Sequence, residues 1–195
     1  MQRAALDEGE IIELSQLIMN NSAHIIQMSG SLLQLATLRN YSPVKEEISV
    51  AKLFDDVALT MKGPLHEKQA RLQLKVGADV VSGQEDLIKS LLLNLCHNAL
   101  KACEDRVGVI VLEAAIVEGS TVLSVADNGC GIAPESLPQL TKPFYRVDKS
   151  RSRHLGGVGL GLTLCKQIAD VHGAKMVIES TVGVGTIVQV TFTTS

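Results

Sequence analysis

The chain contains no tryptophan, few other aromatic residues and no long apolar run. Aromatic residues make up 3% of its 195 positions, and no stretch reaches the roughly 18 consecutive apolar residues of a membrane-spanning helix. Residues 1–10 are acidic and polar, whereas a secretory signal needs a basic start and an apolar core. We therefore expect this chain to be cytoplasmic and to make no membrane contact of its own, which leaves open a membrane anchor elsewhere in a full-length protein.

Clustered basic residues and closely spaced cysteines are also missing. The 18 Lys and Arg residues are scattered among 21 Asp and Glu, for a net charge of -3, so the sequence offers no basic surface for a nucleic-acid backbone. The cysteines show no C-x-x-C spacing, and a chain of this length can form a core without disulfides. We predict no nucleic-acid partner and four reduced thiols, mostly in the core, at Cys96, Cys103, Cys130 and Cys165.

Apolar residues of helical period are present between residues 11 and 35. The first row alternates steps of three and four, with the polar Asn21 as one interruption, and comprises Ile11, Leu14, Ile18, Ile25, Met28, Leu32 and Leu35. A second row seven apart, beginning at Ile12, widens the apolar stripe, so the helix needs neighbours on two sides. This pattern predicts that the helix self-associates or packs against a partner helix. One long helix lying on its own domain is the alternative.

Residues 43–195 alternate between helix and strand patterns, and we predict that they form one domain. Expected helices cover residues 50–61, 84–103 and 160–171, and expected strands cover 71–76, 107–117, 121–126, 175–180 and 186–191. Residues 134–157 are polar, irregular and too long for an ordinary connection, which predicts a functional loop or lid. The predicted fold class is α+β, a two-layer α/β sandwich with one mixed, largely antiparallel sheet covered by helices on one face.

Three polar side chains share one face of the helix expected at residues 84–103. Asn94, Asn98 and Lys101 are four and three positions apart, so they project from nearly the same side. Amide oxygens are hard ligands that suit Mg²⁺, and a lysine offsets phosphate charge. The pattern fits a magnesium-bound triphosphate, but an ordinary solvated helix face explains it equally well.

Two glycine-containing motifs follow. The first motif, Asp127-Asn-Gly129-Cys-Gly131-Ile132, comes directly after an expected strand. Its carboxylate can accept a hydrogen bond from the amino group of adenine, and its glycines let the backbone come close to the ring. Turn chemistry alone also produces this pattern. Residues 156–162 form a glycine run that enters a helix, whose free amides attract phosphate. This run follows no strand and contains no Walker motif. Occurring in this order, the three motifs predict a nucleotide site.

These motifs resemble those of bacterial sensor histidine kinases of two-component systems, within the superfamily that includes gyrase, heat-shock chaperone and mismatch-repair ATPases. The resemblance covers residues 47–195. Residues 94–101 resemble the family's N box, 127–132 and 157–162 its two glycine boxes, and 142–146 its F box. Residues 145–153 resemble the kinase lid, and His172-Gly173 with residues 183–186 fit the closing hairpin. It implies an ATP-binding fold of the Bergerat type, with ATP and Mg²⁺ as cofactors and transfer of the γ-phosphoryl group to a histidine.

The resemblance also implies roles for individual residues. Asn98 would ligate Mg²⁺, Asn94 and Lys101 would contact phosphates, and Asp127 would bind adenine. The other implied cofactor-binding residues are Gly129, Gly131, Ile132 and Thr186 at the adenine, Tyr145, Arg146, Lys149 and Arg151 in or beside the lid, and Gly157, Gly159, Leu160 and Gly161 around the phosphates. Phe144 would anchor the lid by packing. The candidate catalytic residues are His97, Asn98 and Lys101; for His97, an ordinary surface imidazole is the alternative.

The phosphoacceptor motif of the family, H-[DE]-x-[RK]-x-P, is missing from the sequence. None of the five histidines, His24, His66, His97, His154 and His172, has that context. The resemblance implies that the long helix of residues 1–42 is part of a dimerisation and histidine-phosphotransfer region that lacks this motif, and that a homodimer forms through it. We expect this chain to be the C-terminal part of a longer kinase, with a histidine-bearing dimerisation hairpin and a response regulator receiver domain as partners. The alternatives are a switch or chaperone ATPase, a serine kinase of the anti-sigma type, and a nucleotide-binding module used for dimerisation.

Overall fold

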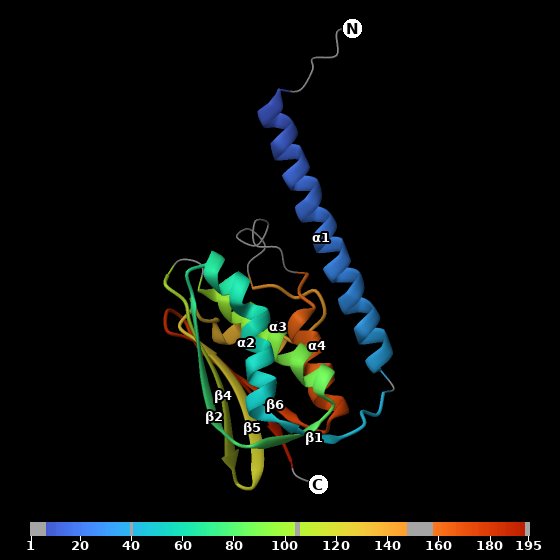
Figure 1. The fold of residues 1–195 in the computed structure, drawn as a ribbon, viewed down its shortest axis with the longest axis vertical. Helices are drawn as coiled ribbons and strands as arrows, with labels where there is room; N and C mark the ends of the chain where they lie inside the picture. The colour runs from blue at the N-terminus through green and yellow to red at the C-terminus, as the bar shows by residue number, and fades with distance from the viewer. Residues whose placement is uncertain (1–6, 40, 104–105, 148–157, 194–195) are drawn as a thin grey trace.

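The computed structural model describes residues 7–39, 41–103, 106–147 and 158–193, and contains one long helix beside a domain of two layers (Figure 1). The helices are α1 (Glu8–Leu38), α2 (Val50–Glu67), α3 (Glu85–Ala102), α4 (Gly161–Val171) and the 3-10 helix η1 (Pro134–Gln139). The strands are β1 (Glu46–Ser49), β2 (Arg71–Gly77), β3 (Val80–Gly83), β4 (Val109–Val117), β5 (Ser120–Asp127), β6 (Lys175–Thr181) and β7 (Gly185–Phe192). No helix within these residues is both long and apolar enough to cross a bilayer.

The main sheet has the strand order β2-β4-β5-β7-β6. Strands β2 and β4 are parallel, and the other neighbours are antiparallel. Helices α2, α3 and α4 lie together on one face of this sheet (Figure 1). The predicted two-layer α+β fold with a mixed sheet is therefore confirmed. Strands β1 and β3, which pair with each other, were not predicted, because four residues are too few to establish an alternating pattern.

The core lies between the helices and the sheet. Helix α2 contributes Phe54 and Met61, and α3 contributes Leu91 and Leu92, all fully buried. Helix α2 runs six residues further than predicted and includes Pro64, because Leu65 continues its buried face. Burying a side chain of this size contributes about 1.5–3 kcal/mol to stability.

The four cysteines are free thiols, and Cys96, Cys103 and Cys165 are buried, as predicted, while Cys130 is exposed. Burial raises the pKa of Cys96 to about 12. This thiol is therefore protonated at neutral pH and acts as a small apolar residue.

Helix α1 joins the domain through its C-terminal turns and projects beyond it at the other end (Figure 1). Leu38 is buried in the domain core, Leu35 packs against it, and α1 contacts α4. Toward the N-terminus, the side chains of Ile12, Ile18 and Ile26 are 64–72% exposed. The last turns of α1 thus lie on their own domain, which fits the alternative of one long helix lying on its own domain. The exposed isoleucines nearer the N-terminus provide the apolar surface that self-association requires.

Candidate nucleotide site

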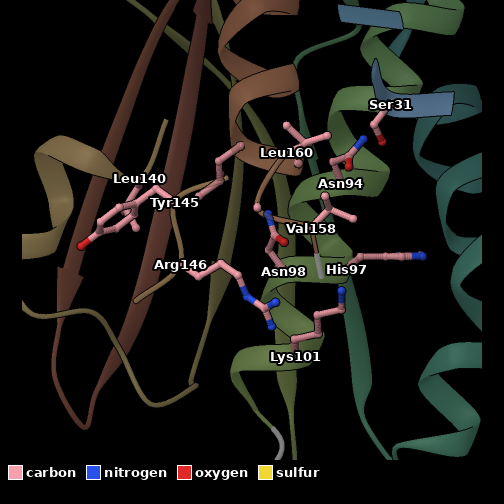
Figure 2. A pocket seen from close by; sticks show the side chains of 13 residues that line it. Ser31, Asn94, His97, Asn98, Lys101, Leu140, Tyr145, Arg146, Val158 and Leu160 are labelled. Atoms are coloured by element: carbon pink, nitrogen blue, oxygen red, sulfur yellow. The ribbon is translucent and has the colours of Figure 1, made fainter. Parts of the chain in front are cut away.

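The polar face of α3 forms one wall of a cavity of about 270 Å³ (Figure 2). Asn94, His97, Asn98 and Lys101 all line it, because three-and-four spacing aligns them on one side of the helix. The opposite side of α3 is leucine-rich and buried in the core, which fixes the direction in which the polar side faces. The structure therefore brings together the three candidate catalytic residues predicted from the sequence.

The start of α4 forms the facing wall of this cavity. Gly159, Leu160 and Gly161 line it, and a side chain at Gly161 would lie 3.2 Å from the Asn94 Oδ1 and 3.6 Å from the Asn98 Nδ2. The Asn94 Nδ2 donates to the Ser90 carbonyl at 2.8 Å, which fixes the orientation of the carboxamide. Two carboxamides therefore face the first turn of α4, where unpaired backbone amides attract anions.

Gly159 holds the segment that enters α4 against the backbone of Phe144 and Tyr145. Its φ is +75°, and a side chain there would lie 2.8 Å from the Tyr145 carbonyl oxygen. The Phe144 amide donates to the Gly159 carbonyl at 3.0 Å. The Phe144 side chain is 55% exposed, and most of the segment that it was predicted to anchor lies outside the described residues, so its packing role stays a prediction. Phe144 adopts a φ of +64° where its backbone meets Gly159.

Two cationic side chains converge on the cavity. Lys101 and Arg146 both line it, and Figure 2 shows the Arg146 guanidinium directed toward Lys101. The pKa of Lys101 is lowered, first by burial and then by the charge of Arg146. Because the positive charges of Lys101 and Arg146 repel each other, the pair suits a ligand with several negative charges. No carboxylate is found among the described residues that line the cavity.

His97 lies beside this pair of cations. Burial lowers its pKa, and the charge of Lys101 adds to the effect, so the imidazole is neutral at neutral pH. Its Nδ1 is buried without a hydrogen-bond partner in the described part of the chain. His97 also lines a second cavity, next to Ser90 and Leu93, so it lies in the wall between the two. A merely solvated surface imidazole does not fit this position.

The residues predicted to bind adenine gather at the C-terminal end of α3. Asp127 is the last residue of β5 and pairs with Thr186 of β7. The Asp127 Oδ1 accepts from the Gly129 amide at 2.7 Å. The Ser180 hydroxyl accepts from the Ile132 amide at 2.8 Å and lies 2.9 Å from the Thr186 hydroxyl.

Burial raises the pKa of Asp127, while hydrogen bonds from the backbone amides of Gly129 and Thr186 oppose that rise. The two glycines of this motif are required by packing. A side chain at Gly129 would lie 2.6 Å from the Ala102 Cβ, and one at Gly131 would lie 2.1 Å from the Thr181 carbonyl oxygen. Ala102 directly follows Lys101 on α3, but none of the described residues predicted to bind adenine is among those that line the cavity.

The remaining predicted residues divide into two sets. Tyr145 lines the cavity, but Figure 2 shows its ring directed away from Asn98 and Lys101. Lys149, Arg151 and Gly157 lie outside the described residues. Four further residues line the cavity: Ser31, Leu140, Val158 and Leu162. Val158 and Leu162 belong to the predicted glycine run, whereas no predicted motif contains Ser31 or Leu140.

The donor set fits a magnesium ion that is held together with phosphates. The described residues contain no group of three or more His, Cys, Asp or Glu side chains that could hold a metal ion alone. The Asn98 carboxamide supplies one hard oxygen, and Mg²⁺ commonly takes one or two protein ligands in addition to phosphate oxygens and water. Asn98 would be that ligand.

The domain consists of a mixed sheet beneath three helices. Its cavity is lined by cations, carboxamides and a helix N-terminus, and this lining suits a polyanionic ligand. Residues 83–195 match the family of histidine kinase-, DNA gyrase B-, and HSP90-like ATPases. The chain belongs to this family.

The chain is similar to proteins named as sensor proteins and sensor histidine kinases. The chain is 34% identical over 194 residues to the sensor histidine kinase YkoH of Bacillus subtilis, covering 98% of this chain and 42% of YkoH. It is 33% identical over 177 residues to the phosphate regulon sensor protein PhoR of Pseudomonas aeruginosa, covering 87% of this chain and 39% of PhoR. The predicted resemblance to sensor histidine kinases is confirmed. The chain spans less than half the length of both relatives.

Solved structures support the fold. Full-length ShkA in complex with AMPPNP matches with a TM-score of 0.78 at 23% identity, covering 98% of this chain and 41% of that chain. The histidine kinase AdeS of Acinetobacter baumannii matches with a TM-score of 0.76 at 19% identity, covering 97% of this chain and 86% of that chain. Both matches include α1 as well as the two-layer domain, since nearly the whole chain is covered.

Proposed function

We propose that this chain is the catalytic part of a sensor histidine kinase, which binds Mg²⁺-ATP and transfers its γ-phosphoryl group to a histidine of a partner segment. The observation that carries this proposal is the convergence of Lys101 and Arg146 on the cavity that faces the N-terminus of α4. That geometry favours a triphosphate, and the match of residues 83–195 to an ATPase family supports the same ligand.

The residues of the cavity would orient the nucleotide and neutralise its charge. In this proposal, Asn98 ligates Mg²⁺, Lys101 and Arg146 bind phosphates, and Asp127 accepts a hydrogen bond from the adenine amino group. Bound Mg²⁺ would supply charge neutralisation at the phosphates. Phosphoryl transfer needs alignment and charge stabilisation more than covalent help from the protein.

His97 is proposed to assist the reaction as a neutral imidazole. Its low pKa leaves a ring nitrogen free to accept a hydrogen bond at neutral pH. An ATPase would instead need a base that positions water, commonly a carboxylate, and the described lining residues contain none. This favours the kinase over the ATPase alternative.

The partners are proposed on the same basis. A histidine-bearing dimerisation hairpin would supply the acceptor, and a response regulator receiver domain would take the phosphoryl group from it. Histidine kinase ThkA has been solved in complex with a response regulator protein, and this chain matches that complex with a TM-score of 0.74, covering 96% of this chain and 52% of that chain. A homodimer through α1 remains part of the proposal.

Transfer of labelled phosphate to a separately made acceptor hairpin tests the proposal. We expect a label on the hairpin that is lost in acid and retained in alkali, because a phosphoramidate is acid-labile. A hairpin with its histidine replaced by glutamine is the control and should remain unlabelled. An acid-stable label would favour the serine-kinase alternative, and release of inorganic phosphate alone would favour the ATPase.

A further inference from the structure

Helix α1 contributes one residue, Ser31, to the walls of the nucleotide cavity. The other lining residues belong to α3, to the segment of residues 140–146 or to the segment that enters α4. Figure 2 shows Ser31 on the α1 ribbon next to Asn94, above Asn98 and Lys101. No motif identified in the sequence includes Ser31, so this contact arises from the way α1 docks.

The docking of α1 has a fixed register. Two side-chain hydrogen bonds join it and the segment that follows it to α3: Gln34 Nε2 donates to Ser90 Oγ at 3.4 Å, and Tyr41 Oη donates to Gln84 Oε1 at 2.9 Å. The later residue, Tyr41, bonds Gln84 at the start of α3, and the earlier residue, Gln34, bonds Ser90 further along. The end of α1 and the start of α3 therefore run antiparallel. One turn before Gln34, this register brings Ser31 beside Asn94.

The docked part of α1 carries an apolar row that ends at the cavity. Ser31, Leu35 and Leu38 lie four and three positions apart and therefore share one face. Leu38 is buried in the core and Leu35 packs against it, whereas Ser31 is partly buried against the polar wall. The Ser31 hydroxyl is thus held at the edge of the cavity, on the helix row that is otherwise apolar.

The position of Ser31 along α3 indicates which part of the nucleotide it meets. The adenine group of residues packs on Ala102, and Asn94 lies eight residues earlier, about 12 Å along the helix at 1.5 Å per residue. A nucleotide whose adenine lies at Asp127 therefore extends its triphosphate toward Asn94 and Ser31. The end of that triphosphate is the phosphate that is transferred.

We propose that the Ser31 hydroxyl donates a hydrogen bond to the terminal phosphate of bound ATP. This inference rests on the proposed nucleotide site, and it makes α1 part of that site. ADP lacks the terminal phosphate, so ATP strengthens the docking of α1 on the domain and ADP does not. Release of α1 after phosphoryl transfer follows from the same contact.

The test compares ATP and ADP binding to the full chain by titration calorimetry with Mg²⁺. Ser31→Ala should weaken ATP binding about tenfold, the size expected for a hydrogen bond to a charged group, and leave ADP binding unchanged. Ser31→Thr, which keeps a hydroxyl, should restore most of the affinity. Ser29→Ala is the matched control, because Ser29 is exposed on the same helix and should change neither affinity.

Hydrogen exchange of residues 28–38 gives a second readout. ATP should slow exchange there more than ADP does in the original chain, and Ser31→Ala should abolish the difference. Equal ATP affinities for the original chain and Ser31→Ala would overturn the inference, as would an equal loss for ATP and ADP. If the original chain binds neither nucleotide, the proposed function itself fails, an outcome distinct from the first two.

Discussion

At the scale of single residues, the site depends on side chains that a helix places on one face. The spacing of Asn94, Asn98 and Lys101 predicts their convergence, because helix geometry alone determines it. Arg146 and Thr186 could be assigned only through the resemblance, since their positions depend on how separate segments pack. Ser31 could not be predicted, because the docking register of α1 has no local signal.

Replacing Asn98 tests the magnesium role at this scale. Asn98→Ala removes a hard oxygen ligand while keeping helix propensity, so we expect Mg²⁺-dependent ATP affinity to fall about tenfold, or about 1.4 kcal/mol. Titration calorimetry with and without Mg²⁺ measures this, and the loss should be much smaller in chelator. Asn21→Ala, on the exposed surface of α1, is the matched control. Unchanged affinity in Mg²⁺ would remove Asn98 from the site.

At the scale of elements, one buried histidine connects the two helices that flank the cavity. The Gln84 amide, at the start of α3, donates to the His172 Nε2 at 3.0 Å. The His172 Nδ1 lies 2.7 Å from the Ile168 carbonyl oxygen of α4. Because Nε2 accepts from Gln84, the proton of the neutral ring is on Nδ1, which donates to Ile168. The sequence predicted the three main helices of the domain from their apolar period, whereas this connection between them depends on tertiary structure.

This connection predicts a pH dependence of stability. Burial lowers the pKa of His172, although the bond to Ile168 opposes it, and burial also lowers the pKa of His97. A histidine in the unfolded chain titrates near pH 6.5. Stability is therefore fully present above that pH and falls as the pH drops below it, because protonation removes the acceptor for the Gln84 amide.

Urea unfolding at about pH 7.5 and about pH 5.5 measures this effect, on either side of the unfolded-state pKa. We expect a loss of about 1 kcal/mol at the lower pH, the usual size of one hydrogen bond. His172→Gln should show a smaller pH dependence, whereas His66→Ala, at an exposed position, should retain the original one. A midpoint that does not move with pH in the original chain would contradict the connection.

At the scale of the whole molecule, the domain and α1 differ in how fully their apolar surfaces are covered. The domain has a continuous core beneath α2, α3 and α4, while the N-terminal part of α1 has exposed isoleucines. The heptad pattern predicted the helix. It could not predict that Leu38 enters the domain core, because apolar period does not identify the partner surface.

Self-association through α1 is the prediction at this scale. We expect sedimentation velocity to detect a dimer, and Ile18→Lys with Ile26→Lys to shift it to monomer, because both side chains are exposed and isolated charges disrupt a helical interface. Val182→Lys is the control, since Val182 is 63% exposed in the turn between β6 and β7. A monomer at all concentrations, or an equal effect of Val182→Lys, would contradict this interface.

A crystal structure of the chain with Mg²⁺ and a non-hydrolysable ATP analogue tests the account most directly. We predict that the adenine amino group lies within hydrogen-bond distance of Asp127, that Asn98 ligates the metal, and that the triphosphate extends between α3 and the start of α4 toward Asn94. A nucleotide bound elsewhere, or bound here with Asp127 and Asn98 both out of contact, would contradict the account.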